Sequence, residues 1–344
     1  MSVEISPKLI VPYLAVYFIV ISLTFYFTIS FWPQTNNDSM KKVRIGYGAT
    51  LSNISDKLNK NGLITNKWVF ESFLKIKGLD KSMQAGTFRI LNVHNNNDLI
   101  NSIVFGSPDR KKITFLEGWN MNQVARHLSK ELNFNFSDVM ELFNDEKIIQ
   151  ELQISANTLE GYLFPETYYF FEGVDKISVI KKLVKEHKKF WNEENLSKAD
   201  SLGFTPYQIT TLASIIEGEA IYDSERAIIS AVYHNRLKIG MKLQADPTVQ
   251  YIIDDGPRRL LNKDLRIKSP YNTYMYQGLP PGPINSPGEQ SLIAALSPEN
   301  NDYLYFVAKG DGYHTFSRNE KEHERAKRAF QRVRKKVKRE RTGL

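Results

Sequence analysis

One uncharged stretch near the start of the chain limits what the chain can be. The 24 residues from Leu9 to Trp32 contain no Asp, Glu, Lys or Arg. A helix of this length spans about 36 Å, which exceeds the roughly 30 Å of a bilayer's hydrocarbon core. A buried helix of a soluble domain rarely runs this long without a charge. We therefore predict a transmembrane helix at residues 9–32, preceded by a cytoplasmic stub at residues 1–8.

Two further features bear on the processing and the orientation of this segment. A cleaved signal peptide has a shorter apolar region followed by small residues at a cleavage site, and no such pattern follows here, so we expect an uncleaved anchor. Lys8 precedes the segment, whereas Lys41, Lys42 and Arg44 follow it. These charges weakly favour a cytoplasmic location for the rest of the chain. Long domains translocate largely regardless of flanking charge, so this preference is easily overridden.

The positive charge of the chain is concentrated at its C-terminal end. The formal net charge is +8 for 344 residues. Residues 320–344 carry 11 Lys or Arg and 4 Asp or Glu, which leaves a net charge of about +1 for everything before them. A charge run at the end of an amphipathic helix is usually a solvated face, so we expect no nucleic acid partner.

The composition also removes several kinds of chemistry. The chain has no cysteine, which excludes disulfides, thiolate metal sites and cysteine nucleophiles. The histidines are scattered without the spacing of a zinc site, and the sequence has no glycine-rich phosphate-binding loop and no nucleophile elbow. We therefore expect neither a metal nor a cofactor.

Changes in composition predict four parts after the apolar segment. A polar linker at residues 33–42 leads to a compact module at residues 43–108, in which short strands alternate with helices. Residues 109–330 form a larger mixed domain that ends in a helix, and before this helix Lys309–Gly312 joins two aromatic strands into a hairpin. A basic helical tail covers residues 331–344. The predicted fold class is α+β.

A helix that ends in two glutamates is the most informative segment. Thr205 is a suitable N-cap, and Pro206 suits the first turn. Apolar residues then recur at helical spacing, which predicts one stripe packed into a core. These residues are Ile209, Leu212, Ala213, Ile216 and Ala220. Glu217 and Glu219 lie at the end of this helix, and a second helix follows at residues 223–239.

The positions of the two acids around the helix favour Glu219 modestly as a general acid. With Ile209 at 0° and about 100° per residue, Glu217 lies near 80° and Glu219 near 280°, on opposite sides of the apolar stripe. Glu219 shares its side with Leu212 and Ile215, and apolar surroundings raise a carboxyl pKa. A general acid needs that raised pKa to hold its proton near neutral pH. Spacing alone leaves both acids open, including as ordinary surface residues.

Eight short segments between residues 160 and 308 form an ordered pattern around these acids. They are Glu160–Thr167, Ala213–Glu219, Ser224–Arg226, Val232–Met241, Leu243–Val249, Tyr271–Tyr274, Gly278–Gly282 and Tyr303–Ala308. In this order they resemble the MltG (YceG-like) family of endolytic murein transglycosylases, over about half of the chain. Gly218-Glu219-Ala220 departs from the family, in which Lys, Glu and Thr are frequent at these positions, so the local helix geometry is the point in question.

The resemblance implies a membrane-anchored enzyme with a LysM-like module at residues 43–108 and a catalytic domain at residues 109–330. The catalytic acid of the family is the second acid of the Glu-x-Glu pair, which corresponds to Glu219. Glu217 would then be a supporting or alternative acid. The expected activity is lytic cleavage of the MurNAc–GlcNAc bond of peptidoglycan to leave 1,6-anhydroMurNAc ends, which would terminate nascent glycan strands.

Polar and aromatic residues suit a substrate rich in hydroxyls and apolar CH faces. We expect the substrate-binding residues to be Glu166, Asn235, Gln244, Asp246, Tyr271, Asn272 and Tyr274. If the enzyme were a lysozyme-type hydrolase instead, a second carboxylate would be needed, and Glu217, Glu166 and Asp246 are the candidates.

Two alternatives belong to other classes. A lysozyme-type muramidase would leave reducing ends without the anhydro ring. A non-catalytic wall-binding membrane anchor would need only the module, and the Glu-x-Glu helix argues against it. The resemblance also implies peptidoglycan glycan strands as substrate, cell-wall synthases or divisome proteins as partners, and a single-pass location in the cell membrane with the catalytic domain outside the cytoplasm.

Overall fold

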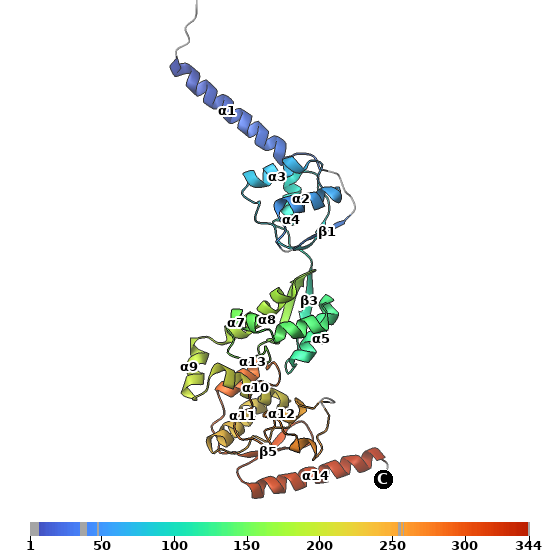
Figure 1. The fold of residues 1–344 in the computed structure, drawn as a ribbon, viewed down its shortest axis with the longest axis vertical. Helices are drawn as coiled ribbons and strands as arrows, with labels where there is room; N and C mark the ends of the chain where they lie inside the picture. The colour runs from blue at the N-terminus through green and yellow to red at the C-terminus, as the bar shows by residue number, and fades with distance from the viewer. Residues whose placement is uncertain (1–6, 35–39, 47, 254–255, 257, 343–344) are drawn as a thin grey trace, which may run out of the picture. The chain divides into compact units, whose positions relative to one another are not determined.

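The chain folds into two compact units, which are described separately (Figure 1). The first unit comprises the residues up to Lys112 together with Tyr169–Asp175, and the second comprises Ile113–Tyr168 and the residues from Lys176 onward. The computed structural model describes residues 7–34, 40–46, 48–253, 256 and 258–342. Parts of the predicted stub, linker and tail, namely residues 1–6, 35–39 and 343–344, lie outside the described residues.

The predicted apolar helix near the N-terminus is confirmed as α1 (Pro7–Ser30). Among the described residues, Val11–Ser30 is the one helical stretch long and apolar enough to cross a membrane. Its large apolar side chains are exposed along most of its length, whereas Ile29 in its last turn is only 2% exposed. A helix that hides so little of its apolar surface against protein needs another apolar environment.

The rest of the first unit is a small α+β module around one core. Its elements are β1 (Lys41–Ile45), α2 (Leu51–Lys60), α3 (Lys67–Ile76), β2 (Gly86–Ile90) and α4 (Asn96–Ile103). The strands β1 and β2 pair antiparallel, with Val43 opposite Phe88. Asn and Thr side chains cap each helix, because their oxygens accept the unpaired N–H groups of the first turn. Alternate residues of both strands then reach the core that α2, α3 and α4 cover.

The start of the predicted linker is part of this module. The main-chain N–H of Gln34 donates to the carbonyl of His94, and its buried side chain bonds Asn96 and Thr65. Asn96 also donates to the carbonyl of Ile29 at 2.7 Å. These bonds fix the last turn of α1 to the module, where a polar composition alone predicts a free tether.

A two-stranded ribbon crosses the boundary between the two units. It consists of β3 (Arg110–Thr114) paired with β4 (Thr167–Phe171). Between these strands lie α5 (Met121–Leu132), α6 (Phe136–Phe143) and α7 (Glu146–Glu151), and after them α8 (Lys176–Phe190) and α9 (Glu193–Ser201). The break between α6 and α7 falls at Asn144, which ends α6, and at Asp145, which caps α7. Their side chains compete for main-chain groups, which favours a break.

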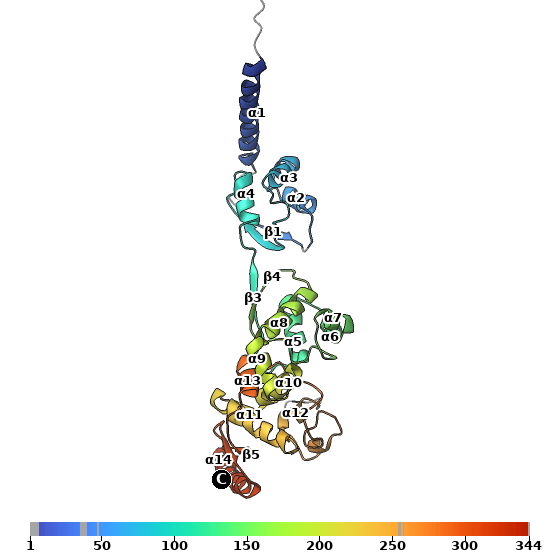
Figure 2. The same ribbon diagram turned by 90° about the vertical axis from the view of Figure 1, so that its left-hand side faces the viewer.

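The second half of the larger unit contains the two predicted helices around the Glu-x-Glu pair. Its elements are α10 (Pro206–Glu219), α11 (Asp223–Lys238), α12 (Asp246–Gln250), η1 (Asp264–Arg266), α13 (Glu289–Leu296), β5 (Tyr305–Ala308), β6 (His314–Ser317) and α14 (Glu320–Thr342). The helix α10 is buried along most of its length and contacts α11, α12 and α13. The strands β5 and β6 form the predicted hairpin, and α14 lies against β5 in both views (Figures 1 and 2).

The fold is therefore a mixed α+β structure with one N-terminal apolar helix. The described residues contain three sheets, each with only two strands. Helices supply most of the core of the second unit, and α10 lies at its centre. The position of α10 decides which side chains surround its last turn.

Candidate active site at the end of α10

The last turn of α10 carries two glutamates, Glu217 and Glu219, on either side of Gly218. The helix begins with the predicted cap, in which the hydroxyl of Thr205 accepts from the N–H of Gln208. It continues through Gly218 and ends at Glu219. A Cβ at position 218 would lie 2.6 Å from the Cβ of Pro247 in α12, so only glycine allows this approach. The glycine therefore lets α12 pack directly against the turn that carries both acids.

Glu217 is held in an ion pair inside the protein. Its Oε2 lies 3.2 Å from Nη1 of Arg226, and the two side chains are 7% and 8% exposed. The same oxygen accepts from the hydroxyl of Ser291 at 2.7 Å and from the N–H of Gly288 at 3.1 Å. Gly288 is the N-cap of α13, whose partial positive charge also favours an anion. Both oxygens of this carboxylate therefore accept hydrogen bonds from protein donors.

Glu219 has a different set of neighbours. Its Oε1 accepts from the hydroxyl of Tyr233 at 3.1 Å, and Tyr233 itself is fully buried. Burial, and to a smaller extent the nearby charge of Asp246, raise the pKa of Glu219 to about 7. The Tyr233 hydroxyl, a main-chain hydrogen bond from Asp246 and the charge of Arg236 act in the opposite direction on this pKa. A carboxyl group with this pKa can donate a proton and take it back near neutral pH.

Two predicted substrate residues lie beside Glu219 with accessible polar atoms. Asp246 is exposed at the first position of α12, and its Oδ1 accepts from the hydroxyl of Tyr274 at 2.5 Å. The side chain of Gln244, two residues earlier, is exposed as well. Gln244 has a φ of 48°, a left-handed conformation that is uncommon for a residue with a side chain. Glu219, Asp246 and Tyr274 thus form one polar cluster that includes an exposed carboxylate.

Four other predicted residues lie in different surroundings. Asn272 is fully buried, and its amide donates to the carbonyls of two loop residues. Asn235 donates to two carbonyls of the segment before β5. Tyr271 packs at 5.1 Å against Tyr251, and Glu166 is exposed next to the ribbon strand β4. The amides of Asn272 and Asn235 therefore hold loop segments in place. Glu166 lies directly before β4.

Sequence reasoning missed three residues that set the properties of the two acids. They are Tyr233, Arg236 and Arg226, all on α11. Each lies within a segment that carries the family resemblance, and Arg226, Tyr233 and Arg236 are spaced by seven and three residues, which places them on one face of a helix. This helical spacing is the sequence signal by which the three residues could have been found. It indicates that α11 turns one polar face toward α10.

A third glutamate, Glu160, is buried in the same unit. Glu160 is 4% exposed, and its carboxylate accepts from the N–H of Met121 at 3.1 Å and from the hydroxyl of Tyr251 at 3.3 Å. Burial raises the pKa of Glu160 to about 8. Its carboxylate lies against Met121, the first residue of α5, and against Tyr251, the residue after α12. Glu160 therefore connects two segments of the larger unit.

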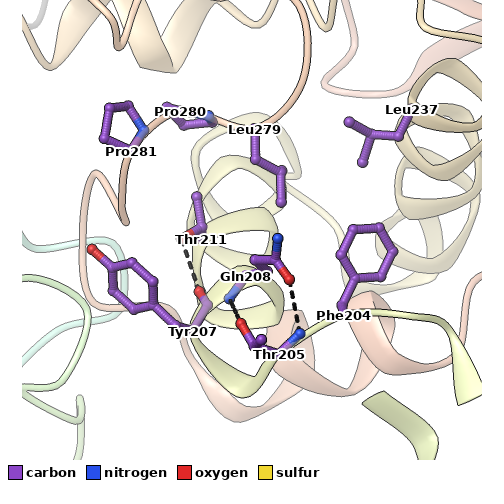
Figure 3. A pocket seen from close by; sticks show the side chains of 9 residues that line it. All are labelled: Phe204, Thr205, Tyr207, Gln208, Thr211, Leu237, Leu279, Pro280 and Pro281. Carbon is purple, nitrogen blue, oxygen red and sulfur yellow. Dashed lines mark hydrogen bonds between the residues drawn. The ribbon is translucent and has the colours of Figure 1, made fainter. Parts of the chain in front are cut away.

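A pocket of about 480 Å³ opens at the other end of α10 (Figure 3). Its walls come from the start of α10, the end of α11 and the proline-rich run before α13. The lining residues are Phe204, Thr205, Tyr207, Gln208, Thr211, Leu237, Leu279, Pro280 and Pro281. Tyr207 precedes Glu219 by twelve residues, about 18 Å along a helix. This pocket therefore does not contain the Glu219 cluster.

Metal binding has no support in the described ranges, where no three His, Asp or Glu side chains are grouped so that they could hold an ion. The end of α10 brings together carboxyl and hydroxyl groups. Glu219 has a pKa raised to about 7, and Glu217 is paired with Arg226.

Comparisons with known proteins identify the family of this chain. The model of the YceG-like family matches residues 43–329. A protein of Bacillus subtilis (strain 168) named endolytic murein transglycosylase is 33% identical over 330 residues, which cover 91% of this chain and 91% of that protein. A protein of the same name from Streptococcus pneumoniae serotype 2 is 28% identical, and the match covers 84% of this chain and 58% of that protein.

A solved structure shares the fold as well. The crystal structure of a yceG-like protein from Listeria monocytogenes superposes with a TM-score of 0.59 at 30% sequence identity, and the match covers 84% of this chain and 99% of that chain. The family match over residues 43–329 includes parts of both units and the Glu-x-Glu turn of α10. On the extent of the family match and the identity to these relatives, the chain belongs to the YceG-like family.

Proposed function

We propose that this protein is an endolytic murein transglycosylase and that Glu219 is its general acid and base. The observation that carries the proposal is the contrast between the two acids of α10. Glu217 is paired with Arg226, whereas Glu219 is half-buried beside a hydroxyl and has a pKa raised to about 7. The names of the Bacillus and Streptococcus relatives supply the substrate, murein.

The reaction follows from one carboxyl group in two roles. Protonated Glu219 donates to the glycosidic oxygen, the bond from that oxygen to C1 of N-acetylmuramic acid breaks, and C1 becomes oxocarbenium-like. The C6 hydroxyl of the same sugar then attacks C1 and gives its proton to the Glu219 carboxylate. The product is a 1,6-anhydro ring, no water is consumed, and the enzyme ends in its starting protonation state.

Hydrolysis would require a second carboxylate, either as a nucleophile or as a base for water. Glu217 is poorly suited, because its oxygens are occupied by Arg226, Ser291 and Gly288. Asp246 is the acid that a hydrolase would use, since it is exposed and lies close enough to raise the pKa of Glu219. We assign Asp246 instead to substrate binding together with Tyr274 and Gln244.

The same proposal covers location and partners. The apolar helix α1 would anchor the chain in the cell membrane, with the catalytic unit outside the cytoplasm. The order β1-α2-α3-β2 supports a LysM-like module, a strand pair around two helices, as a second contact with the wall. Cleavage close to the membrane would terminate nascent strands beside cell-wall synthases or divisome proteins.

The test is the chemistry of the released ends. Full-length protein in detergent is incubated with purified peptidoglycan, and the soluble fragments are measured by mass spectrometry beside Glu219→Gln and Asp246→Asn variants. Anhydro ends that disappear with Glu219→Gln support the proposal. Reducing ends that disappear with Asp246→Asn would make the enzyme a hydrolase. Wall binding without cleavage by the unmodified protein would leave only the anchor function.

A further inference from the structure

Two tyrosines from distant parts of the chain stack on each other next to the last turn of α10. The ring centroids of Tyr222 and Tyr313 are 4.1 Å apart, and the ring planes differ by 17°. The two residues nevertheless remain 37% and 39% exposed. Ile221, the residue before Tyr222, is 69% exposed. The stacked rings of Tyr222 and Tyr313, with the exposed Ile221 next to Tyr222 in the chain, are named the tyrosine platform.

The hairpin tip is shaped to receive this stack. The hydroxyl of Tyr222 donates to the carbonyl of Asp311 at 3.3 Å, and the carboxylate of Asp311 accepts from the N–H of Tyr313 at 3.0 Å. Gly312 has a φ of 94°, and a Cβ there would lie 2.8 Å from the Tyr222 ring. The turn between β5 and β6 is therefore closed directly over the ring of Tyr222.

A chain of contacts fixes the platform relative to Glu219. The N–H and Nδ1 of His314, the residue after Tyr313, lie 2.9 and 2.8 Å from the two carboxylate oxygens of Glu225 on α11. His314 packs edge-on against Phe306, and Phe306 packs edge-on against Tyr233. Tyr233 donates to Glu219. The hairpin thus cannot move without disturbing the side chain that holds the candidate acid.

The platform is also close to Glu219 along the chain. Tyr222 follows Glu219 by three residues, so their Cα atoms are at most about 11 Å apart. A large exposed apolar residue and two exposed rings are costly to leave in water and contribute little packing there. Aromatic rings with a polar edge suit sugars, which offer apolar CH faces and hydroxyls.

We propose that the tyrosine platform is a glycan-binding subsite that holds a saccharide next to the bond cleaved at Glu219. This inference rests on the proposed function, since it takes the substrate class from it. An endolytic enzyme must hold a strand on both sides of the cleaved bond. The Asp246, Tyr274 and Gln244 group supplies polar contacts on α12 and its loop, and the platform supplies stacking contacts from the α10–α11 turn and the hairpin tip.

The test measures binding separately from cleavage. All variants are made in full-length protein that carries Glu219→Gln, so that glycan strands are bound but not cut. Tyr313→Ala and Ile221→Asn are expected to weaken the affinity for uncross-linked glycan strands about tenfold. Tyr313→Phe keeps the ring and should bind like the parent. Phe136→Ala on α6 removes an equally exposed ring, 37%, of the same unit and should have no effect.

A second readout separates a binding role from a purely structural one. In the active enzyme, loss of platform binding should raise KM with little change in kcat, whereas collapse of the hairpin would lower kcat and the thermal midpoint together. Ile221→Asn is the decisive variant, because a side chain so exposed contributes little to stability. Unchanged affinity in Tyr313→Ala and Ile221→Asn, or an equal loss in Phe136→Ala, would overturn the platform. The end-group assay on unmodified protein reports independently whether the proposed function itself holds.

Discussion

Glu217 and Glu219 are two residues apart on one turn of α10, yet their surroundings are opposite. Glu217 faces Arg226 and the start of α13 and accepts hydrogen bonds from three groups. Glu219 faces the hydroxyl of Tyr233 and a second anion, Asp246. Both carboxylates are enclosed, so burial does not distinguish them. The charge of the hydrogen-bonding partner distinguishes them, because Arg226 is a cation and the hydroxyl of Tyr233 is neutral.

The comparison shows how one helix end can hold a structural acid and a reactive acid side by side. A guanidinium partner compensates the desolvation of Glu217 through a charge-assisted contact. A neutral hydroxyl compensates only part of the desolvation of Glu219, so its pKa rises to about 7. Both acids are glutamates on the same turn of α10. The difference between their roles therefore comes from the side chains of α11 and α12 that lie next to each of them.

The largest effect is expected from removing the proton of Glu219. Glu219→Gln keeps the shape and the hydrogen bond with Tyr233 but cannot donate a proton, so turnover should fall about 10²- to 10⁴-fold. The thermal midpoint should stay the same or rise, because a buried ionisable group is lost. Release of anhydro fragments and thermal unfolding of the same sample measure both. A variant with turnover within tenfold of the parent would contradict the assignment.

Removing the charge of Glu217 should mainly reduce stability. Glu217→Gln leaves the enclosed Arg226 without its main partner, which costs about 3–5 kcal/mol. For a unit of this size, the thermal midpoint should fall by roughly 10 °C. The matched control is Asp223→Asn, which removes the exposed partner of the same Arg226 and should cost about 1 kcal/mol or less. Equal losses in the two variants would mean that the Glu217 contact is no stronger than a surface ion pair.

The pH dependence should separate the two acids next. Only protonated Glu219 can act as the acid, so the rate should be level well below pH 7 and fall about tenfold per unit above it. Stability follows the same group: the folded pKa lies above the usual 4.5, so the contribution is complete below pH 4.5 and is lost as pH rises through about 7. Glu219→Gln should remove this loss, which melting curves between pH 4 and 8.5 can measure.

The smallest effect concerns the hydroxyl of Tyr233. Its hydrogen bond lowers the pKa of Glu219, so Tyr233→Phe should raise that pKa and move the alkaline limb of the rate profile upward by less than about one pH unit. The rate on the level part of the profile should change little. A limb that stays in place, or moves to lower pH, would show that Tyr233 does not set the pKa of Glu219.

Part of this site was predictable from the sequence. Helical periodicity placed Glu219 beside Leu212 and Ile215, both of which are fully buried in the structure. The same periodicity predicted α10, the residue types at 205 and 206 predicted its cap, and the turn residues Lys309–Gly312 predicted the hairpin of β5 and β6. These features depend on local spacing and capping, which a single sequence carries. The ordered motifs then pointed to the family to which the chain belongs.

Other parts depend on contacts between distant segments. Asn272 has the chemistry of a sugar ligand, but it is fully buried because its amide closes a loop around two carbonyls. Glu160 lies in a recognised motif, yet only the fold shows that it is enclosed against Met121 and Tyr251. Tyr222 and Tyr313 are 91 residues apart and meet only because the hairpin folds over α11. Periodicity contains no information on such pairs.

The glycine between the two acids acts as a spacer that sets the chemistry of its neighbour. A Cβ at position 218 would lie 2.6 Å from Pro247, whereas ordinary contact begins at 3.4 Å. A larger residue there would therefore need α12 to withdraw by almost an ångström. Asp246 would withdraw with it, and both its charge and its main-chain hydrogen bond would act more weakly on Glu219. The size of the side chain at position 218 thus controls how strongly Asp246 acts on the pKa of Glu219.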